Sequence, residues 1–183
     1  MKKVVFPLFG LLFATYSWAQ ESQTEYNFLR IPVSAHAAAL GGDNISIIEN
    51  DASLIFSNPA LLCNVADKQI NYMNYMQGAN TLSASYNFGV MDRSSLAVSA
   101  QYMDYGQMKE MNPEGIQTGD FKAKDISMAG YFSYMLSDYF SAGISAKFIT
   151  SYIGNYNSIG VGVDLGANYY NADKELSVSA VIK

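Results

Sequence analysis

The sequence predicts an all-β fold, a transmembrane antiparallel up-and-down β-barrel, and two observations lead to this prediction. From Lys68 to Lys183 the chain repeats one pattern seven times: about ten residues alternate apolar with small or polar, and a turn follows. Hydrophobic residues make up 50% of the chain and charged residues only 15%, too few charges for the solvent face of a soluble sheet. In an outer-membrane barrel, lipid-facing and lumen-facing residues alternate, and charge is costly only on the lipid side.

The alternation is clearest between Ser158 and Tyr170. Successive side chains of a strand point to opposite faces, so this stretch has one apolar face and one small, polar face. The apolar face carries Ile159, Val161, Val163, Leu165, Ala167 and Tyr169. From the same pattern we expect strands near residues 68–77, 80–89, 94–104, 124–136, 140–151, 158–170 and 175–183.

The connections between these strands differ in length according to the side on which they fall. If the first strand runs outward, the inner connections are all short, as periplasmic turns of outer-membrane barrels are. The one long connection, residues 105–123, is then an outer loop with five charged residues, Pro113 and three glycines. We interpret it as a solvated surface loop, with a specific docking site as the alternative.

The first residues predict export. Lys2 and Lys3 precede an apolar stretch from Val4 to Tyr16, and small residues follow at Ser17 and Ala19. This is the pattern of a signal peptide over residues 1–19 with cleavage after Ala19, because the apolar stretch is too short for a membrane anchor of about 20 residues. With strands as the membrane-spanning elements, we expect the protein in the outer membrane, in contact with its lipid bilayer.

Residues 20–67 differ from the strands and predict an N-terminal plug segment. Ser34 can cap a short helix over residues 35–40, and Gly41 and Gly42 can end it. Asn58 can cap a second helix with Pro59 at its first position. Such short pieces need a host, and a barrel lumen provides one. The expected plug motif comprises Ser34, His36, Gly41, Gly42, Asn58, Pro59 and Ala60.

Two charged residues fall inside expected strands. Lys147 and Asp164 each lie on the small-residue face, and a hairpin centred between Asn155 and Tyr156 places them opposite each other. We therefore predict a lumenal ion pair between them. The alternative is an ion or substrate site in the lumen.

No catalytic, cofactor or metal site is expected, and we predict that the protein is not an enzyme. His36 is the single histidine and Cys63 the single cysteine, too few for a His and Cys metal site or a nucleophile and base pair. We expect His36 to pack or to form hydrogen bonds within the plug. A net charge of −5 without a basic stripe gives no sign of nucleic acid binding.

Three segments together resemble a known family. They are Tyr26 to Gly42, the acidic patch Glu49-Asn50-Asp51, and Ser57 to Leu62. They resemble the beginning of the PorQ family of the type IX secretion system of Bacteroidetes, within the broader PorV and FadL-like group of barrels. The run through Ser34-Ala35-His36 favours PorQ over PorV. The resemblance implies a barrel with an N-terminal plug and a place beside PorU, PorV and PorZ in the cell-surface attachment complex.

The number of strands predicts an incomplete barrel. Single-chain bacterial barrels have an even number of strands, and an odd count leaves edges that lipid cannot pair. We therefore expect residues 68–183 to be a partial barrel, the N-terminal part of a larger protein. The predicted function is to anchor or scaffold the attachment complex. A FadL-like transporter of hydrophobic small molecules and a soluble secreted β-sandwich are the alternatives.

Overall fold

The computed structural model describes residues 26–65, 68–75 and 78–183. The signal peptide predicted at residues 1–19, with cleavage after Ala19, lies outside the described residues. None of the helices in the described part of the chain is long and apolar enough to cross a membrane.

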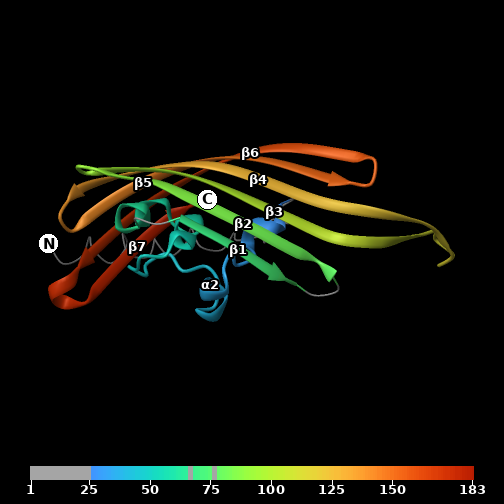
Figure 1. Cartoon of the computed structure of the whole chain (residues 1–183), viewed down its shortest axis with the longest axis horizontal. Helices are drawn as coiled ribbons and strands as arrows, with labels where there is room; N and C mark the ends of the chain where they lie inside the picture. The colour runs from blue at the N-terminus through green and yellow to red at the C-terminus, as the bar shows by residue number, and fades with distance from the viewer. Residues whose placement is uncertain (1–25, 66–67, 76–77) are drawn as a thin grey trace, which may run out of the picture.

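The strands form one antiparallel seven-stranded sheet whose order follows the sequence from β1 to β7 (Figure 1). A β-sandwich would need two packed sheets. The strands are β1 (Lys68–Asn74), β2 (Asn80–Met91), β3 (Ser94–Met111), β4 (Gln117–Ser137), β5 (Phe140–Ile153), β6 (Tyr156–Asn171) and β7 (Leu176–Ile182). We call the end with the β1–β2, β3–β4 and β5–β6 connections the hairpin end, and the opposite end, where η6 (Ala172–Lys174) lies, the turn end.

The predicted long loop over residues 105–123 is wrong. β3 continues to Met111 and β4 begins at Gln117, so only residues 112–116 form a turn. A bulge near Gly106, with φ +75°, interrupts the pairing between Asp104 and Gln107, after which the ladder resumes. The charges of this segment suggest a loop, but strands that lie in water carry charges freely.

The plug segment, residues 26–65, contains four short helices that lie on one face of the sheet (Figure 1). Its η4 helix contacts β3 to β6, and its η3 helix contacts β1 and β2. Two apolar clusters fill the space between plug and sheet, one around Ile55, Leu62 and Tyr131 and one around Phe28 and Met103. The helices are η2 (Asn27–Arg30), α2 (Ala35–Ala39), η3 (Ala52–Phe56) and η4 (Pro59–Asn64).

The buried face of the sheet is polar and the exposed face is apolar, the reverse of the usual arrangement in a soluble protein. The face under the plug, here the plug face, is polar and buried: Ser83 is 2% exposed and Ser145 0%. The other face, here the apolar face, is open: Ile70 is 79% exposed and Val161 82%. Exposed apolar surface of this extent marks an interaction with a partner or a membrane.

Candidate functional site: the interface of plug and sheet

Hydrogen bonds from sheet side chains to plug carbonyl oxygens hold the plug on the sheet. Ser83 Oγ donates to Val33 O at 2.7 Å, Ser141 Oγ to Ala60 O at 3.0 Å and Gln101 Nε2 to Phe28 O at 3.3 Å. Short helices and irregular segments leave many main-chain carbonyls without partners, and burying them unpaired costs stability. Similar donors are Ser85, Asn87, Ser133 and Ser177.

The segment Asn58-Pro59-Ala60 lies in a niche that glycines of β5 and β6 leave open. A Cβ added at Gly143 would lie 2.6 Å from Ala60 N, and one at Gly166 would lie 3.0 Å from Pro59 Cδ and closer still to Asn58 Oδ1. Both distances are shorter than ordinary contacts of a Cβ atom. These two glycines are therefore required for the main chain of the plug to approach the sheet, a role that the alternating pattern alone does not show.

Asn58 connects this segment to the rest of the plug. Its Oδ1 accepts from Ala60 N at 2.9 Å, and its Nδ2 donates to Ile45 O at 2.7 Å. The residue is 0% exposed, and Pro59 occupies the first position of η4. The predicted cap is confirmed, although the helix is of the 3₁₀ type. Both ends of the amide are used, so an aspartate could cap η4 but could not also donate to Ile45 O.

The predicted α2 helix also has the expected ends. Ser34 Oγ accepts from Ala37 N at 3.0 Å and donates to Ser53 Oγ at 2.9 Å, which links α2 to η3. At the other end Gly42 N bonds Ala37 O and Gly41 N bonds Ala38 O, with φ of +93° at Gly41 and +104° at Gly42. This is a Schellman motif, which glycine adopts without steric cost.

His36 lies between two carboxylates. Its Nδ1 is 2.6 Å from Asp51 Oδ2, and its Nε2 is 3.4 Å from Glu49 Oε2. The hydrogen bond with Asp51 raises the pKa of His36 above its ordinary 6.5, as do the charges of Asp51 and Glu49, although burial opposes them. The sequence showed the acidic patch but not this contact.

Asp51 also caps η3. Its Oδ1 accepts from Ser53 N at 2.8 Å. Burial raises the pKa of Asp51, but hydrogen bonds from His36 and Ser53 lower it more, so the net pKa lies below the ordinary 3.8. The carboxylate therefore ties α2 to η3 in its charged form.

Lys147 and Asp164 form an ion pair on the plug face, as the sequence predicted, and Ser145 Oγ donates to Asp164 Oδ2 at 3.1 Å. The predicted register is wrong: Ile153 pairs with Tyr156, which sets Lys147 opposite Gly162 and Asp164 opposite Ser145. The shift is two residues, so both side chains keep their face, and lysine is long enough to reach the carboxylate diagonally. The side chains are 12% and 6% exposed. The loss of either charge would leave the other buried without a countercharge.

A cavity of about 670 Å³ lies beside this pair, between plug and sheet. Apolar side chains of both partners line most of it, among them Leu29, Phe56 and Ile149. It is the place where the described part of the chain could hold a small apolar molecule.

Cys63 is buried in η4, with its Sγ 2.9 Å from Ser133 Oγ. Burial raises the pKa of the thiol, against a lowering by its hydrogen bonds, so little reactive thiolate is present at neutral pH. Within the described residues, no three His, Cys, Asp or Glu side chains lie together as metal ligands would.

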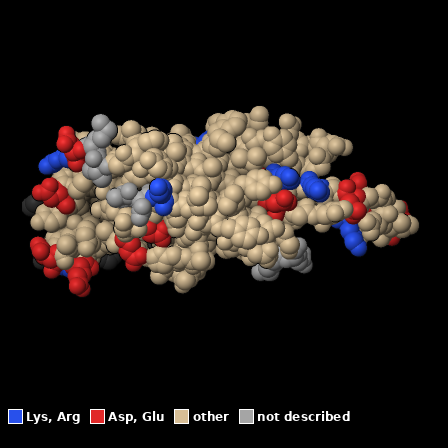
Figure 2. Space-filling view, in the orientation of Figure 1, with Lys and Arg blue, Asp and Glu red and all other residues tan. Residues whose placement is uncertain are grey.

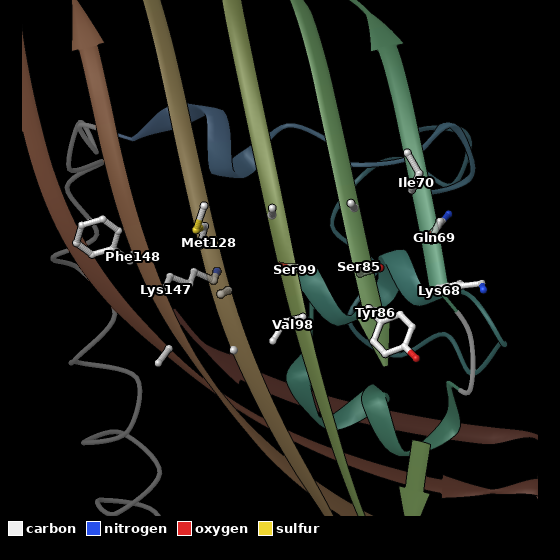
Figure 3. A pocket seen from close by; sticks show the side chains of 15 residues that line it. Lys68, Gln69, Ile70, Ser85, Tyr86, Val98, Ser99, Met128, Lys147 and Phe148 are labelled. Carbon is white, nitrogen blue, oxygen red and sulfur yellow. The ribbon is translucent and has the colours of Figure 1, made fainter. Parts of the chain in front are cut away.

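A groove of about 980 Å³ crosses the apolar face from β1 to β5 (Figure 3). Its floor consists of small residues that pair across strands, Ala84 with Ala100 and Gly130 with Ala146. Larger side chains border it, namely Ile70, Tyr86, Val98, Met128 and Phe148 (Figure 3). It is an apolar depression on the open side of the sheet, separate from the plug.

No protein-family model and no curated protein matches the chain.

The glycine niche gives a first prediction. Gly143→Ala should lower the free energy of unfolding by about 1–3 kcal/mol, because the added methyl group overpacks the contact with Pro59 and Ala60. Gly130→Ala is the matched control, since a Cβ there has no atom within 4 Å. Denaturant unfolding of both variants, with protease sensitivity of the plug as a second readout, tests this. Equal stabilities would show that the niche does not hold the plug.

The single histidine allows a direct pH test. The contribution of His36 is present below its unfolded pKa of about 6.5 and is lost as the pH rises through its higher folded pKa. The contribution of Asp51 is present above its unfolded pKa of 3.8 and is lost as the pH falls through its lower folded pKa. The link is therefore strongest between about pH 4 and 6.5.

In NMR titration the His36 pKa should lie above 6.5 and return toward that value in Asp51→Asn, which keeps an oxygen to cap η3. Glu49→Gln should have a smaller effect. An unchanged pKa in Asp51→Asn would contradict the contact.

Proposed function

We propose that the seven strands are part of an outer-membrane β-barrel, exported by the signal peptide, whose apolar face contacts lipid and whose plug is a fixed part of the wall. The observation that carries this proposal is an apolar zone with sharp limits on the exposed face of the sheet, which carries no charged side chain from β2 to β7. On the edge strand β1, Lys68 lies on this face opposite Tyr86. The turn end would face the periplasm and the hairpin end the outside.

A row of polar residues limits this zone at the hairpin end. It crosses the sheet from β1 to β6 through successive register partners, which places all its members at one level. The row consists of Asn74, Asn80, Asp104, Lys124 and Asn157, with the aromatic Tyr152 at the same level on β5. Just below it the same face presents Tyr72, Leu82, Tyr102 and Ile126, which are register partners too. The change from polar to apolar within one step along the strands is expected at a water and lipid boundary.

The length of the zone fits a bilayer. On β4 the apolar positions run from Ile126 to Leu136, which corresponds to about 34 Å along the strand at about 3.4 Å per residue. At a tilt of about 40° this becomes about 25 Å, the height of the apolar band of outer-membrane barrels.

Aromatic residues and charges are distributed as a membrane protein requires. Tyr102 and Tyr152 lie near the hairpin end of the apolar face, and Tyr134, Phe140 and Tyr169 near its turn end. Such girdles occur at both membrane interfaces. In the view of Figure 2, charged side chains gather toward the two ends of the molecule, with an uncharged stretch between them.

β1 and β7 are the edges of the described sheet. Lipid offers no hydrogen bonds to the main chain of an edge strand, so a spanning sheet must be closed. We therefore include in the proposal that further strands, of the same polypeptide or of a partner chain, complete the barrel.

The plug favours an anchoring function over transport. A plug that opens a path for transport must move away from the sheet. Here Asn58-Pro59-Ala60 packs tightly against Gly143 and Gly166, and buried hydrogen bonds from several strands hold it. A fixed plug makes a stiff support. Together with the resemblance to the PorQ family, it supports a barrel that anchors or scaffolds the attachment complex of type IX secretion, with PorU, PorV and PorZ as the proposed partners.

One observation favours transport of hydrophobic small molecules as a second candidate. The cavity of about 670 Å³ beside Lys147 and Asp164 is largely apolar and could hold such a molecule. Co-purification of PorZ or PorU with the full-length barrel would support anchoring. Uptake of fatty acids without any bound partner would support transport and overturn the anchoring function.

The membrane proposal predicts a marked asymmetry between two arginine substitutions. Ala146→Arg places a charge in the middle of the apolar face and should destabilise the barrel by about 2–4 kcal/mol in lipid. Gln107→Arg, on β3 beyond the polar row, should have little effect. Urea unfolding from vesicles and the amount of heat-modifiable protein in the outer-membrane fraction measure the difference. A soluble wild-type protein, or equal effects of the two substitutions, would refute the proposal.

A further inference from the structure

We infer that the far part of the β3–β4 hairpin, residues 107–122 and here the ribbon, docks a protein partner at the cell surface through an apolar tip. The inference rests on the proposed function and names the element of the barrel that meets the partner.

The ribbon extends past the strands beside it. The last pair of β2 with β3 is Asn80 with Asp104, and the last pair of β5 with β4 is Ile153 with Ala123. Beyond these pairs, β3 and β4 continue as a ladder with each other up to Met111 and Gln117. In Figure 1 this hairpin projects farther than the other two tips of the same end.

The position of the ribbon relative to the polar row places it in water. Met111 is seven residues past Asp104, or about 24 Å along an extended strand at about 3.4 Å per residue. The side of the ribbon that continues the apolar face is polar, with Gln107 opposite Lys122 and Lys109 opposite Asp120. A tip at this distance from the apolar zone, on a polar stem, meets a surface partner and not the bilayer.

Hydrogen bonds within the turn at the tip hold it in a defined conformation. Asn112 N donates to Ile116 O at 3.0 Å, Gly115 N to Asn112 O at 2.9 Å, and Ile116 N to Asn112 Oδ1 at 2.8 Å. Pro113 fixes one backbone angle, and Gly115 takes a φ of +80°. The tip is therefore preorganised, which lowers the entropic cost of binding.

The tip presents apolar side chains to water. Met111 is 58% exposed and Ile116 63%, on the two arms next to the turn. Methionine adapts to irregular apolar pockets and is frequent on binding surfaces. An isolated two-stranded ribbon is marginally stable in water. A partner that covers the exposed apolar residues at its end would therefore stabilise the ribbon.

The charges of the tip specify the partner further. Between Glu110 and Gln117 the chain carries two carboxylates, Glu110 and Glu114, and no cation. The complementary surface is an apolar pocket bordered by Lys or Arg side chains. The partner is therefore a protein with such a pocket, and a lipid or glycan surface is the competing outcome of the test.

The test uses the full-length protein in cells, with a benzophenone photo-cross-linker at position 116. We expect one protein adduct, whose cross-linked peptide maps to an apolar pocket bordered by basic residues. Met111→Ser should reduce the adduct at least tenfold, and Glu110→Gln together with Glu114→Gln should reduce it severalfold. Gln107→Ser with Thr118→Ser is the matched control on the same ribbon and should leave the yield unchanged.

The outcomes separate this inference from the proposed function. Adducts with lipid or lipopolysaccharide alone, the absence of any adduct, or a protein adduct that Met111→Ser does not reduce would each overturn the docking inference. Each of these results leaves the barrel proposal intact as long as the protein remains heat-modifiable in the outer-membrane fraction. Loss of the wild-type protein from that fraction would refute the barrel, and the docking inference with it.

Discussion

The hydrogen bonds between side chains of the sheet and main-chain carbonyls of the plug are the interaction on which the rest of the structure depends. Because the plug consists of short helices and irregular segments, its carbonyls need donors from outside. Ser83, Ser141 and Gln101 provide them, so the plug face carries small and polar side chains at these positions. Apolar residues such as Met103 and Tyr131 pack the space between them. The opposite face carries exposed large apolar side chains such as Ile70 and Val161, and the described part of the chain does not cover it.

Strand positions could be predicted from the sequence wherever a strand alternates between the two faces. β6 is an example, because Val161, Val163 and Leu165 alternate with glycine and aspartate over its whole length. The strands of the ribbon could not be predicted in this way, because they lie beyond the apolar zone and both of their faces are exposed. The register of the β5–β6 hairpin could not be predicted from alternation either, because alternation repeats every two residues and a shift by two leaves every side chain on the same face.

In the plug, contacts between residues close in the sequence could be predicted, and contacts between distant residues could not. The caps at Ser34 and Asn58 could be predicted because capping is local and involves atoms only two or three residues away. The niche at Gly143 and Gly166 could not, because the reason for these glycines lies more than eighty residues earlier in the chain, at Asn58 to Ala60. The surroundings of His36 could be predicted only in part. The sequence shows the acidic residues at 49 and 51, but their contact with the imidazole depends on how α2 and η3 are placed.

In an anchoring barrel, the interface of plug and sheet and the tip of the ribbon would have different functions. Where the plug meets the sheet, contacts are buried, side chains of the sheet donate to carbonyl oxygens of the plug, and Gly143 and Gly166 have no room for a larger side chain, so this region has little freedom to respond to a ligand. At the hairpin end, Met111 and Ile116 lie on a ribbon whose strands pair with each other beyond Gln107 and Lys122, while its base also accepts a hydrogen bond from Gly154 N at Lys122 O. A partner held there would gain from a stiff base, because the rigidity of the plugged sheet reduces the motion that binding must otherwise restrict. A transporter needs the reverse arrangement, with freedom at the plug and no need for an apolar tip in water.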